Sequence, residues 1–266
     1  MKRNFILVAA AAALAVFSTG CQKLKARDNL NKGVQAFKGA RYADAEKLFQ
    51  SAVELDPAWS IAHLYLATAY VNQYIPGAES PENQQKADAA FKAFQRVLEL
   101  EPANEVALAS IASLYYNQKK LDEATVWNKK LIQVNPQAKE AYYTLAVIAW
   151  QQWLGPNREA RIKMGMKVED PGPLKDKKVR EELRAKYIPL LDEGIQHTQK
   201  ALDIDKEYDD AMAYMNLLIR YRADLLDTPE EYKKETERAD EWITKALATK
   251  KMKAERQPVQ GGITPP

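Results

Sequence analysis

The chain of 266 residues is long enough to bury a sizeable core, and 46% of its residues are hydrophobic. Its 39 basic and 36 acidic residues nearly balance, so the composition gives no indication of a nucleic-acid partner. A single cysteine excludes an intramolecular disulfide framework and a cysteine-based zinc site, and the alanine-rich composition favours helices.

The N-terminal residues follow the order of a secretory signal peptide. Lys2 and Arg3 are followed by an uninterrupted apolar run over residues 5–17, and small residues then lead to Cys21. The run is too short to span a bilayer comfortably. It therefore predicts a leader over residues 1–20.

The placement of Cys21 resembles the lipobox of bacterial lipoproteins, in which the cysteine is acylated and the leader is cut before it. The family usually has leucine three positions earlier, where this chain has Ser18, so ordinary secretion or an uncleaved anchor are alternatives. A buried core cysteine is a further alternative, and a catalytic thiol lacks a histidine close by in the sequence. Gln22 follows the cysteine, which in the enterobacterial sorting pattern favours the outer membrane. We expect a lipid-anchored, periplasm-facing protein of the cell envelope.

The remainder of the chain is built from repeats. The segments VELDPAWSIAHLYLATAY, LELEPANEVALASIASLYY and IQVNPQAKEAYYTLAVIAW each join a helix end, a proline and a new amphipathic helix. Pro102 and Pro136 are 34 residues apart. This spacing resembles that of the tetratricopeptide repeat (TPR).

Small and aromatic residues recur at the positions of the TPR signature in five successive units. The matching residues are Gly33, Ala45, Phe49 and Pro57; Leu66, Ala67, Tyr70, Ala90, Phe94 and Pro102; Ile111, Ala112, Tyr115, Ala124 and Pro136; Leu145, Ala146 and Ala201; Met215, Ala239, Ile243 and Ala246. Asn128 and Lys206 stand where the family has Phe and Pro. The resemblance covers residues 26–250 and implies an all-α TPR solenoid, a right-handed superhelix of about five helical hairpins whose first helices line a concave groove.

Two connections inside repeats are longer than the period requires. In the first, Ser80 followed by Pro81 predicts the start of a helix. In the second, Thr228 with Glu231 three residues later predicts a capping box. The simplest interpretation is that the helices of these repeats are longer.

Repeat four contains the largest departure, an insert over residues 151–186. Its segment 170–173, Asp-Pro-Gly-Pro, predicts a turn, and we expect a short helix near 157–165 and a long helix from about residue 176. The stretch 155–186 holds ten basic and six acidic residues. The insert is interpreted as a lid or partner-docking flap at the groove edge, with a solvated charged arm, a degenerate sixth repeat or a contact with anionic lipid as alternatives.

The sequence shows no catalytic motif. His63 and His197 fall in different repeats without a second histidine or cysteine at metal-ligand spacing, and no phosphate-binding glycine loop occurs. We predict that the protein is not an enzyme and needs no cofactor or metal.

The TPR pattern places a set of first-helix side chains on the groove. These candidate partner-binding residues are Phe37, Leu64, Thr68, Val71, Ser113, Tyr116, Asn117, Tyr143, Val147, Trp150, Gln151, Leu217, Arg220 and Tyr221. Aromatic residues interspersed with amides suit an extended or helical peptide, although Tyr143 and Trp150 could instead pack beneath the insert. The Lys, Asn and Arg clamp of chaperone-binding TPR proteins is absent from the sequence, which argues against recognition of a free C-terminal carboxylate.

Together these features predict a non-enzymatic, lipid-anchored TPR scaffold that binds a protein or peptide partner in the cell envelope. The stretch DDAMAYMNLLIRYRADLLDTPEEY resembles uncharacterised envelope TPR lipoproteins of acidobacterial type. A component of an outer-membrane protein or type IV pilus assembly machine is an alternative, and a small-ligand binder is a second one. The solenoid is expected over residues 21–256 and a disordered tail over 257–266. The oligomeric state stays open.

Overall fold

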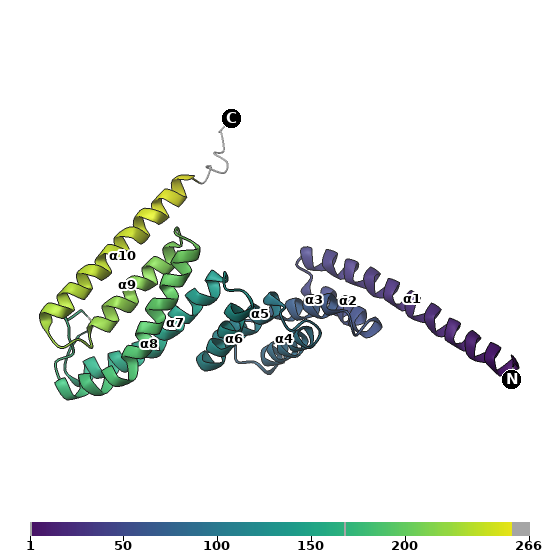
Figure 1. The fold of residues 1–266 in the computed structure, drawn as a ribbon, viewed down its shortest axis with the longest axis horizontal. Coiled ribbons are helices and arrows are strands. Elements are labelled where there is room, and N and C mark those ends of the chain that lie inside the picture. Colours follow the sequence, from purple (N-terminus) through teal and green to yellow (C-terminus); the bar gives the residue numbers. More distant parts are fainter. Residues whose placement is uncertain (1, 168, 257–266) are drawn as a thin grey trace. The chain divides into compact units, whose positions relative to one another are not determined.

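The computed structural model describes residues 2–167 and 169–256, with side chains from residue 20 onward, and the predicted tail lies outside this part. Figure 1 shows that the described chain is all-α, as predicted. Its helices are α1 (Lys2–Lys38), α2 (Tyr42–Leu55), α3 (Ser60–Val71), α4 (Pro81–Leu100), α5 (Glu105–Asn117), α6 (Leu121–Val134), α7 (Lys139–Lys163), α8 (Lys177–Ile204), α9 (Asp209–Ala223) and α10 (Pro229–Arg256).

The chain divides into two compact units, residues 1–130 and residues 131–266. Within the first unit, α1 packs against α2 and α3 against α4; within the second, α7 packs against α8 and α9 against α10. The predicted leader falls within α1, and none of the helices in the described part is long and apolar enough to cross a membrane.

The small and aromatic residues of the first unit pack as the repeat pattern predicts. Gly33 of α1 lies directly against the ring of Phe49 of α2, which is fully buried. In the next hairpin Phe94 is buried in a cluster that also holds Ala67 and Ile111. Small side chains let the helix backbones approach each other, and the aromatic rings fill the space between successive hairpins.

The two predicted helix starts are confirmed. The Ser80 hydroxyl accepts a hydrogen bond from the Asn83 backbone N–H at 3.1 Å, with Pro81 as the first residue of α4. The Thr228 hydroxyl accepts from the Glu231 backbone N–H at 3.1 Å, and the Glu231 carboxylate accepts in return from the Thr228 N–H. This reciprocal pair is the capping box expected from the sequence.

The helix expected near 157–165 does not stand alone, because α7 continues through Pro156 without a break. Proline lacks a backbone N–H, and its ring disfavours the helical conformation of a preceding residue that has a Cβ. That preceding residue is Gly155, which has no Cβ to clash with the ring. The insert therefore lengthens α7, and α8 begins at Lys177, close to the predicted start.

The connection between α7 and α8 is part of the core of the second unit. Met166 and Leu174 lie on this connection, and both are buried, Leu174 completely. Leu174 belongs to the same cluster as the fully buried Trp153 and Leu218. The alternative of a solvated charged arm is thus wrong, because the loop contributes apolar side chains to the core, and the lid or partner-docking flap at the groove edge stays a prediction. The insert also adds no sixth hairpin to the described chain.

The close contact between Gly33 and Phe49 gives a test of the packing. A Cβ at residue 33 would lie 2.5 Å from a ring carbon of Phe49, so Gly33→Ala should lower the free energy of unfolding by about 1–3 kcal/mol. Urea titration monitored by circular dichroism measures this. Gly39→Ala is the control just past the end of the same helix, where an added Cβ would lie 3.4 Å from its nearest atom, an ordinary contact. Equal stability of the two variants would contradict the packing described.

Candidate functional site

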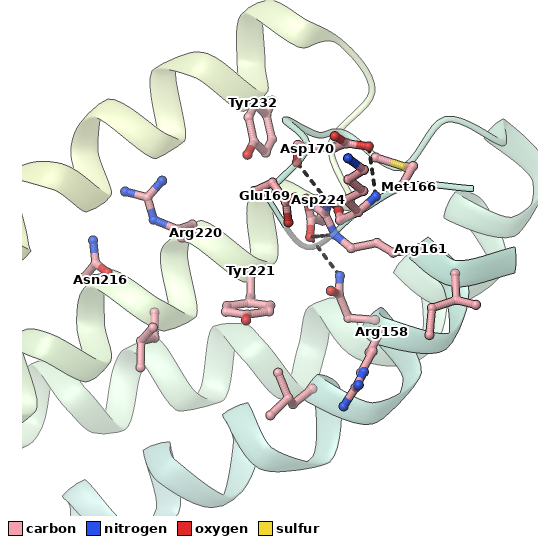
Figure 2. Close-up of a pocket in the computed structure, with 15 residues that line it drawn as sticks. Arg158, Arg161, Met166, Glu169, Asp170, Asn216, Arg220, Tyr221, Asp224 and Tyr232 are labelled. Carbon is pink, nitrogen blue, oxygen red and sulfur yellow. Dashed lines mark hydrogen bonds and ion pairs between the residues drawn. The ribbon is translucent and has the colours of Figure 1, made fainter. Parts of the chain in front are cut away.

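A pocket of about 620 Å³ lies in the second unit between α7, α9, the start of α10 and the α7–α8 connection. It is lined by Leu154, Asn157, Arg158, Arg161 and Ile162 of α7, by Asn216, Leu217, Arg220, Tyr221 and Asp224 at α9, by residues 166, 167, 169 and 170, and by Tyr232 of α10. Figure 2 shows Tyr221 near the middle of the hollow, with Tyr232 on one side and Arg158 on the opposite side.

The spacing of the lining residues follows the helical period. On α7 the pocket uses positions 154, 157, 158, 161 and 162, and on α9 and its end it uses 216, 217, 220, 221 and 224. Intervals of three and four place each set on one face of its helix. The pocket is therefore the space between two first helices of neighbouring repeats, closed by the α7–α8 connection.

A buried ion pair closes one end of the pocket. The guanidinium of Arg161 contacts both carboxylate oxygens of Asp224, at 2.6 Å and 3.2 Å, and both side chains are more than nine-tenths buried. Asn157 donates a third hydrogen bond to the carboxylate at 2.8 Å. The second terminal nitrogen of Arg161 donates to the backbone carbonyls of Lys167 and Asp170. A buried pair of charges is tolerable only when its hydrogen-bonding capacity is satisfied in this way.

The loop after α7 also approaches the α9–α10 turn closely. The Leu174 N–H donates to the backbone carbonyl of Asp224 at 2.9 Å. A Cβ at Gly172 would lie 2.5 Å from a carboxylate oxygen of Asp224 and 2.6 Å from the ring of Tyr232. A side chain at residue 172 would overlap the Asp224 carboxylate and the Tyr232 ring, so glycine is the residue that fits there.

Two further arginines of the insert bind the same turn. Arg184 of α8 forms two hydrogen bonds of 2.8 Å with the Asp227 carboxylate and a third with the Leu225 carbonyl. Buried Arg180 donates to the carbonyls of Leu174 and Asp227. The Arg184 guanidinium lowers the pKa of Asp227 below its usual value through these hydrogen bonds. Three of the ten basic residues in the stretch 155–186, Arg161, Arg180 and Arg184, thus serve internal contacts.

An aromatic row leads along α7 and α9 into the pocket. Tyr143 lies 5.1 Å from Tyr208 and 5.3 Å from Tyr214, and Trp150 lies 5.7 Å from Tyr214 and 6.2 Å from Tyr221, measured between ring centroids. Three of these pairs are nearly perpendicular, the edge-to-face arrangement that aromatic rings prefer. All five rings are half-buried, so the row is both packed and partly accessible.

The predicted groove residues divide evenly between the two units. In the second unit, Leu217, Arg220 and Tyr221 line the pocket, and Tyr143 and Trp150 belong to the aromatic row. Gln151 is half-buried on the helical turn before Leu154. Val147 is only 5% exposed, so it supports the groove from within the core.

The candidates of the first unit lie on α1, α3 and α5. Ser113 is exposed, and the other six are half-buried: Phe37, Leu64, Thr68, Val71, Tyr116 and Asn117. The ring of Phe37 contacts that of Tyr42, and the Thr68 hydroxyl donates a hydrogen bond to the Leu64 carbonyl. They remain candidates for partner contact.

Several pocket residues were missed by the sequence prediction. The helical period of the predicted residues on α7 continues through Asn157, Arg158 and Arg161. The Gly-Pro pair at 155–156 predicts a helix end, so the sequence gives no indication of this continuation. Asp224 and Tyr232 lie at a turn and at the start of α10. Only the folded chain brings them to α7.

Each of the two histidines contacts neighbouring groups of the fold. A ring nitrogen of His63 lies 3.0 Å from the Pro57 carbonyl, and His197 lies 3.4 Å from Glu193 and beside the ring of Tyr142. Over the residues that the structure describes, no three His, Cys, Asp or Glu side chains gather as a metal site.

Comparison with known proteins identifies the fold. Residues 83–148 match the tetratricopeptide repeat family. A crystal structure of MamA protein superposes with a TM-score of 0.56 at 14% identity, covering 90% of this chain and 98% of that one. MamA 41-end from Desulfovibrio magneticus RS-1 gives a TM-score of 0.56 at 15% identity, over 86% and 96% of the two chains. No curated protein sequence matches the chain. The fold is an all-α TPR solenoid of helical hairpins.

The buried ion pair predicts a large cost for removing one charge. Arg161→Leu should lower the free energy of unfolding by about 3–5 kcal/mol, because Asp224 would remain buried without a cation. Denaturant unfolding measures the change, and exposed Arg158→Leu on the same helix should alter it by less than about 0.5 kcal/mol. The double variant Arg161→Leu with Asp224→Leu should recover part of the loss. A single variant as stable as the parent would contradict the role of the pair.

The Asp227–Arg184 contact predicts a pH-dependent contribution to stability. Because the folded-state pKa of Asp227 is lowered, its contribution is present above about pH 4 and disappears as the pH falls through the lowered pKa. Asp227→Asn should therefore lower the melting temperature at pH 7, and its difference from the parent should shrink toward pH 2. Glu230→Gln in the same turn region is the control. A difference that does not change with pH would contradict this assignment.

Proposed function

We propose that this protein is a non-enzymatic scaffold that binds a peptide segment of a protein partner on the α7–α9 face of its second unit. The observation that carries the proposal is the aromatic row that opens into a pocket on the first helices of two adjacent repeats. Rigid aromatic side chains give large contact area at a small entropic cost, which is why they dominate binding hot spots. The groove also offers amide groups, which can bond to a peptide backbone.

The fold supports binding along an extended surface. Helical hairpins stacked in a solenoid present their first helices side by side, and each repeat adds side chains to the same face. The insert adds a closed end to that face through the Arg161–Asp224 pair. The pocket volume would also accommodate a small ligand, which is the second candidate function.

We also propose that the scaffold is attached to a membrane of the cell envelope through acylated Cys21, facing the periplasm, with the outer membrane favoured by Gln22. Cys21 is exposed in α1. Ala26 is the first buried side chain in the described part of α1, and five residues of helix span only about 7.5 Å. A lipid on Cys21 would hold the first hairpin close to the membrane surface.

Site-specific photocrosslinking in intact cells tests the binding face. A photoreactive amino acid in place of Leu217 should give discrete protein adducts, because this side chain lines the pocket. The same amino acid in place of exposed Lys234 on α10 is the control. Adducts identified by mass spectrometry would name the partner. If Leu217 gave no adducts, or only those also formed at Lys234, the scaffold proposal would fail at this face.

Substitution of the cysteine tests the anchor. Cys21→Ala should release the protein from the membrane fraction and abolish labelling by an alkyne-tagged fatty acid. Ser18→Leu should preserve both properties, because it brings the sequence closer to the lipoprotein pattern. Membrane retention of Cys21→Ala at the parental level would exclude acylation as the anchor and leave the peptide-binding proposal untouched.

A further inference from the structure

We propose that the pocket between α7, α9 and α10 holds an uncharged aromatic side chain of the partner peptide that carries a hydrogen-bond donor, with tryptophan as the best fit and Asn216 as its acceptor. This inference rests on the proposed function and names the anchor residue of the partner. Three features of the pocket carry it: a balance of charge, an aromatic surface at the end of the aromatic row, and a buried acceptor to which no donor is bound.

The charged side chains at the pocket balance one another. The cations are Arg158, Arg161, Lys167 and Arg220, and the carboxylates are Glu169, Asp170, Asp224 and, paired with Arg220 at the surface, Asp240. Arg161 and Asp224 are bound to each other. A charged side chain of a partner would lose its hydration in the pocket and gain no surplus of the opposite charge, so an uncharged side chain fits best.

The aromatic row ends in the pocket with the ring of Tyr221. Trp150 lies 6.2 Å from Tyr221, at an interplanar angle of 80°. Figure 2 shows the ring of Tyr221 edge-on near the middle of the hollow, with Tyr232 on one side. Leu217 and Ile162 add aliphatic surface to the lining, and 65% of the surface of Ile162 is exposed. An aromatic side chain in the pocket would extend the row by one ring and cover this apolar surface.

The lining also contains a buried acceptor to which no donor is bound. Asn216 of α9 is only 7% exposed, and its Nδ2 donates a hydrogen bond to the Ala239 carbonyl of α10 at 2.7 Å. This bond fixes the orientation of the amide, because only the nitrogen can donate to a carbonyl. Among the described residues, no group donates to the Asn216 Oδ1. An apolar occupant would bury this oxygen without a partner, whereas an occupant with an N–H or O–H group would satisfy it.

The hydroxyl groups of the pocket are available to the rest of the peptide. Tyr221 and Tyr232 are half-buried, and within the described chain neither hydroxyl makes a hydrogen bond. A phenol hydroxyl can donate to a carbonyl or accept from an N–H group. These two groups would bond to the peptide backbone on either side of the anchor residue.

Tryptophan meets the three conditions together. Its indole is uncharged, offers a large aromatic surface and carries an N–H group that only donates. Tyrosine also carries a donor, on a smaller ring. Phenylalanine and leucine would leave the Asn216 oxygen without a donor once water is displaced, and such a loss discriminates strongly between otherwise similar occupants.

Isothermal titration calorimetry on the purified full chain tests this proposal. The probes are uncharged peptides QTGXGTQ, blocked at both ends, in which X is tryptophan, phenylalanine, leucine or 3-benzothienylalanine. The last residue keeps the shape of the indole and replaces its N–H group by sulfur. The tryptophan peptide should bind about fivefold more tightly than the benzothienylalanine peptide, because only tryptophan donates to Asn216. Equal binding of these two peptides, or binding of none of the four at about 1 mM, would overturn the proposal.

Two variants of the pocket locate the effect. Asn216→Leu should reduce the advantage of tryptophan over benzothienylalanine to less than about twofold, because the acceptor is removed. Leu217→Lys should weaken binding of the tryptophan peptide about tenfold, because it adds a charge to the lining. Leu247→Lys is its control, since Leu247 is an exposed leucine of α10 outside the lining. If circular dichroism shows that Asn216→Leu does not fold, the two lysine variants decide the matter. An undiminished advantage in folded Asn216→Leu, or equal binding by the two lysine variants, would contradict the proposal.

A saccharide is the other uncharged ligand that aromatic rings and an amide would suit. Competition distinguishes it: an excess of N,N′-diacetylchitobiose should not displace the tryptophan peptide. Displacement would assign the pocket to a sugar and overturn the peptide anchor.

The photocrosslinking experiment separates the two levels of the account. Adducts at Leu217, together with no preference for the tryptophan peptide, would remove the anchor residue and leave the scaffold proposal standing. Absence of adducts at Leu217 in the parent protein would remove the binding face itself.

Discussion

The buried contact between Arg161 and Asp224 is the interaction on which the second unit's architecture depends. Transferring both charges from water is costly, and the cost is offset by a two-point ion pair, the amide of Asn157 and two backbone carbonyls. The pair joins the end of α7 to the end of α9. It thereby fixes the separation of the two helix faces that form the pocket.

The insert has a structural role that shapes a binding surface. The first helices α3 and α5 hold 12 and 13 residues, and at that length α7 would end near residue 151. Here α7 continues, its connection to α8 contributes Leu174 to the core, and Arg180 and Arg184 hold the α9–α10 turn. The result is a groove with one closed, partly apolar end. A long connection in a repeat protein can therefore create a site without moving as a lid.

The fold could be predicted from local patterns, and the pocket could be predicted only in part. The sequence predicts the role of Ser80 from its neighbours in the chain, because a helix cap is a local structure. It predicts the packing of Gly33 and Phe49 from the repeat period. Leu217 and Tyr221 followed from the same period.

Local sequence patterns do not predict that α7 continues past Pro156. The local rule that proline ends a helix reflects a cost of about 3 kcal/mol. In the folded chain α7 continues nevertheless: beyond the proline, Ala160 packs into the core of the second unit and Arg161 bonds to Asp224, a residue 63 positions further along the chain. Because Arg161 and Asp224 become neighbours only in the folded chain, the sequence alone does not predict this contact.

Hydrogen exchange measured by mass spectrometry, on the full chain at neutral pH, tests most directly whether the insert is part of the folded second unit. The amides of Met166 and Leu174 are bonded to the carbonyls of Arg161 and Asp224. The account predicts that both exchange nearly as slowly as the buried centres of α8 and α9 and that they exchange together with them in denaturant. Exchange of this segment within seconds, while α8 and α9 stay protected, would contradict the claim that the insert builds the pocket.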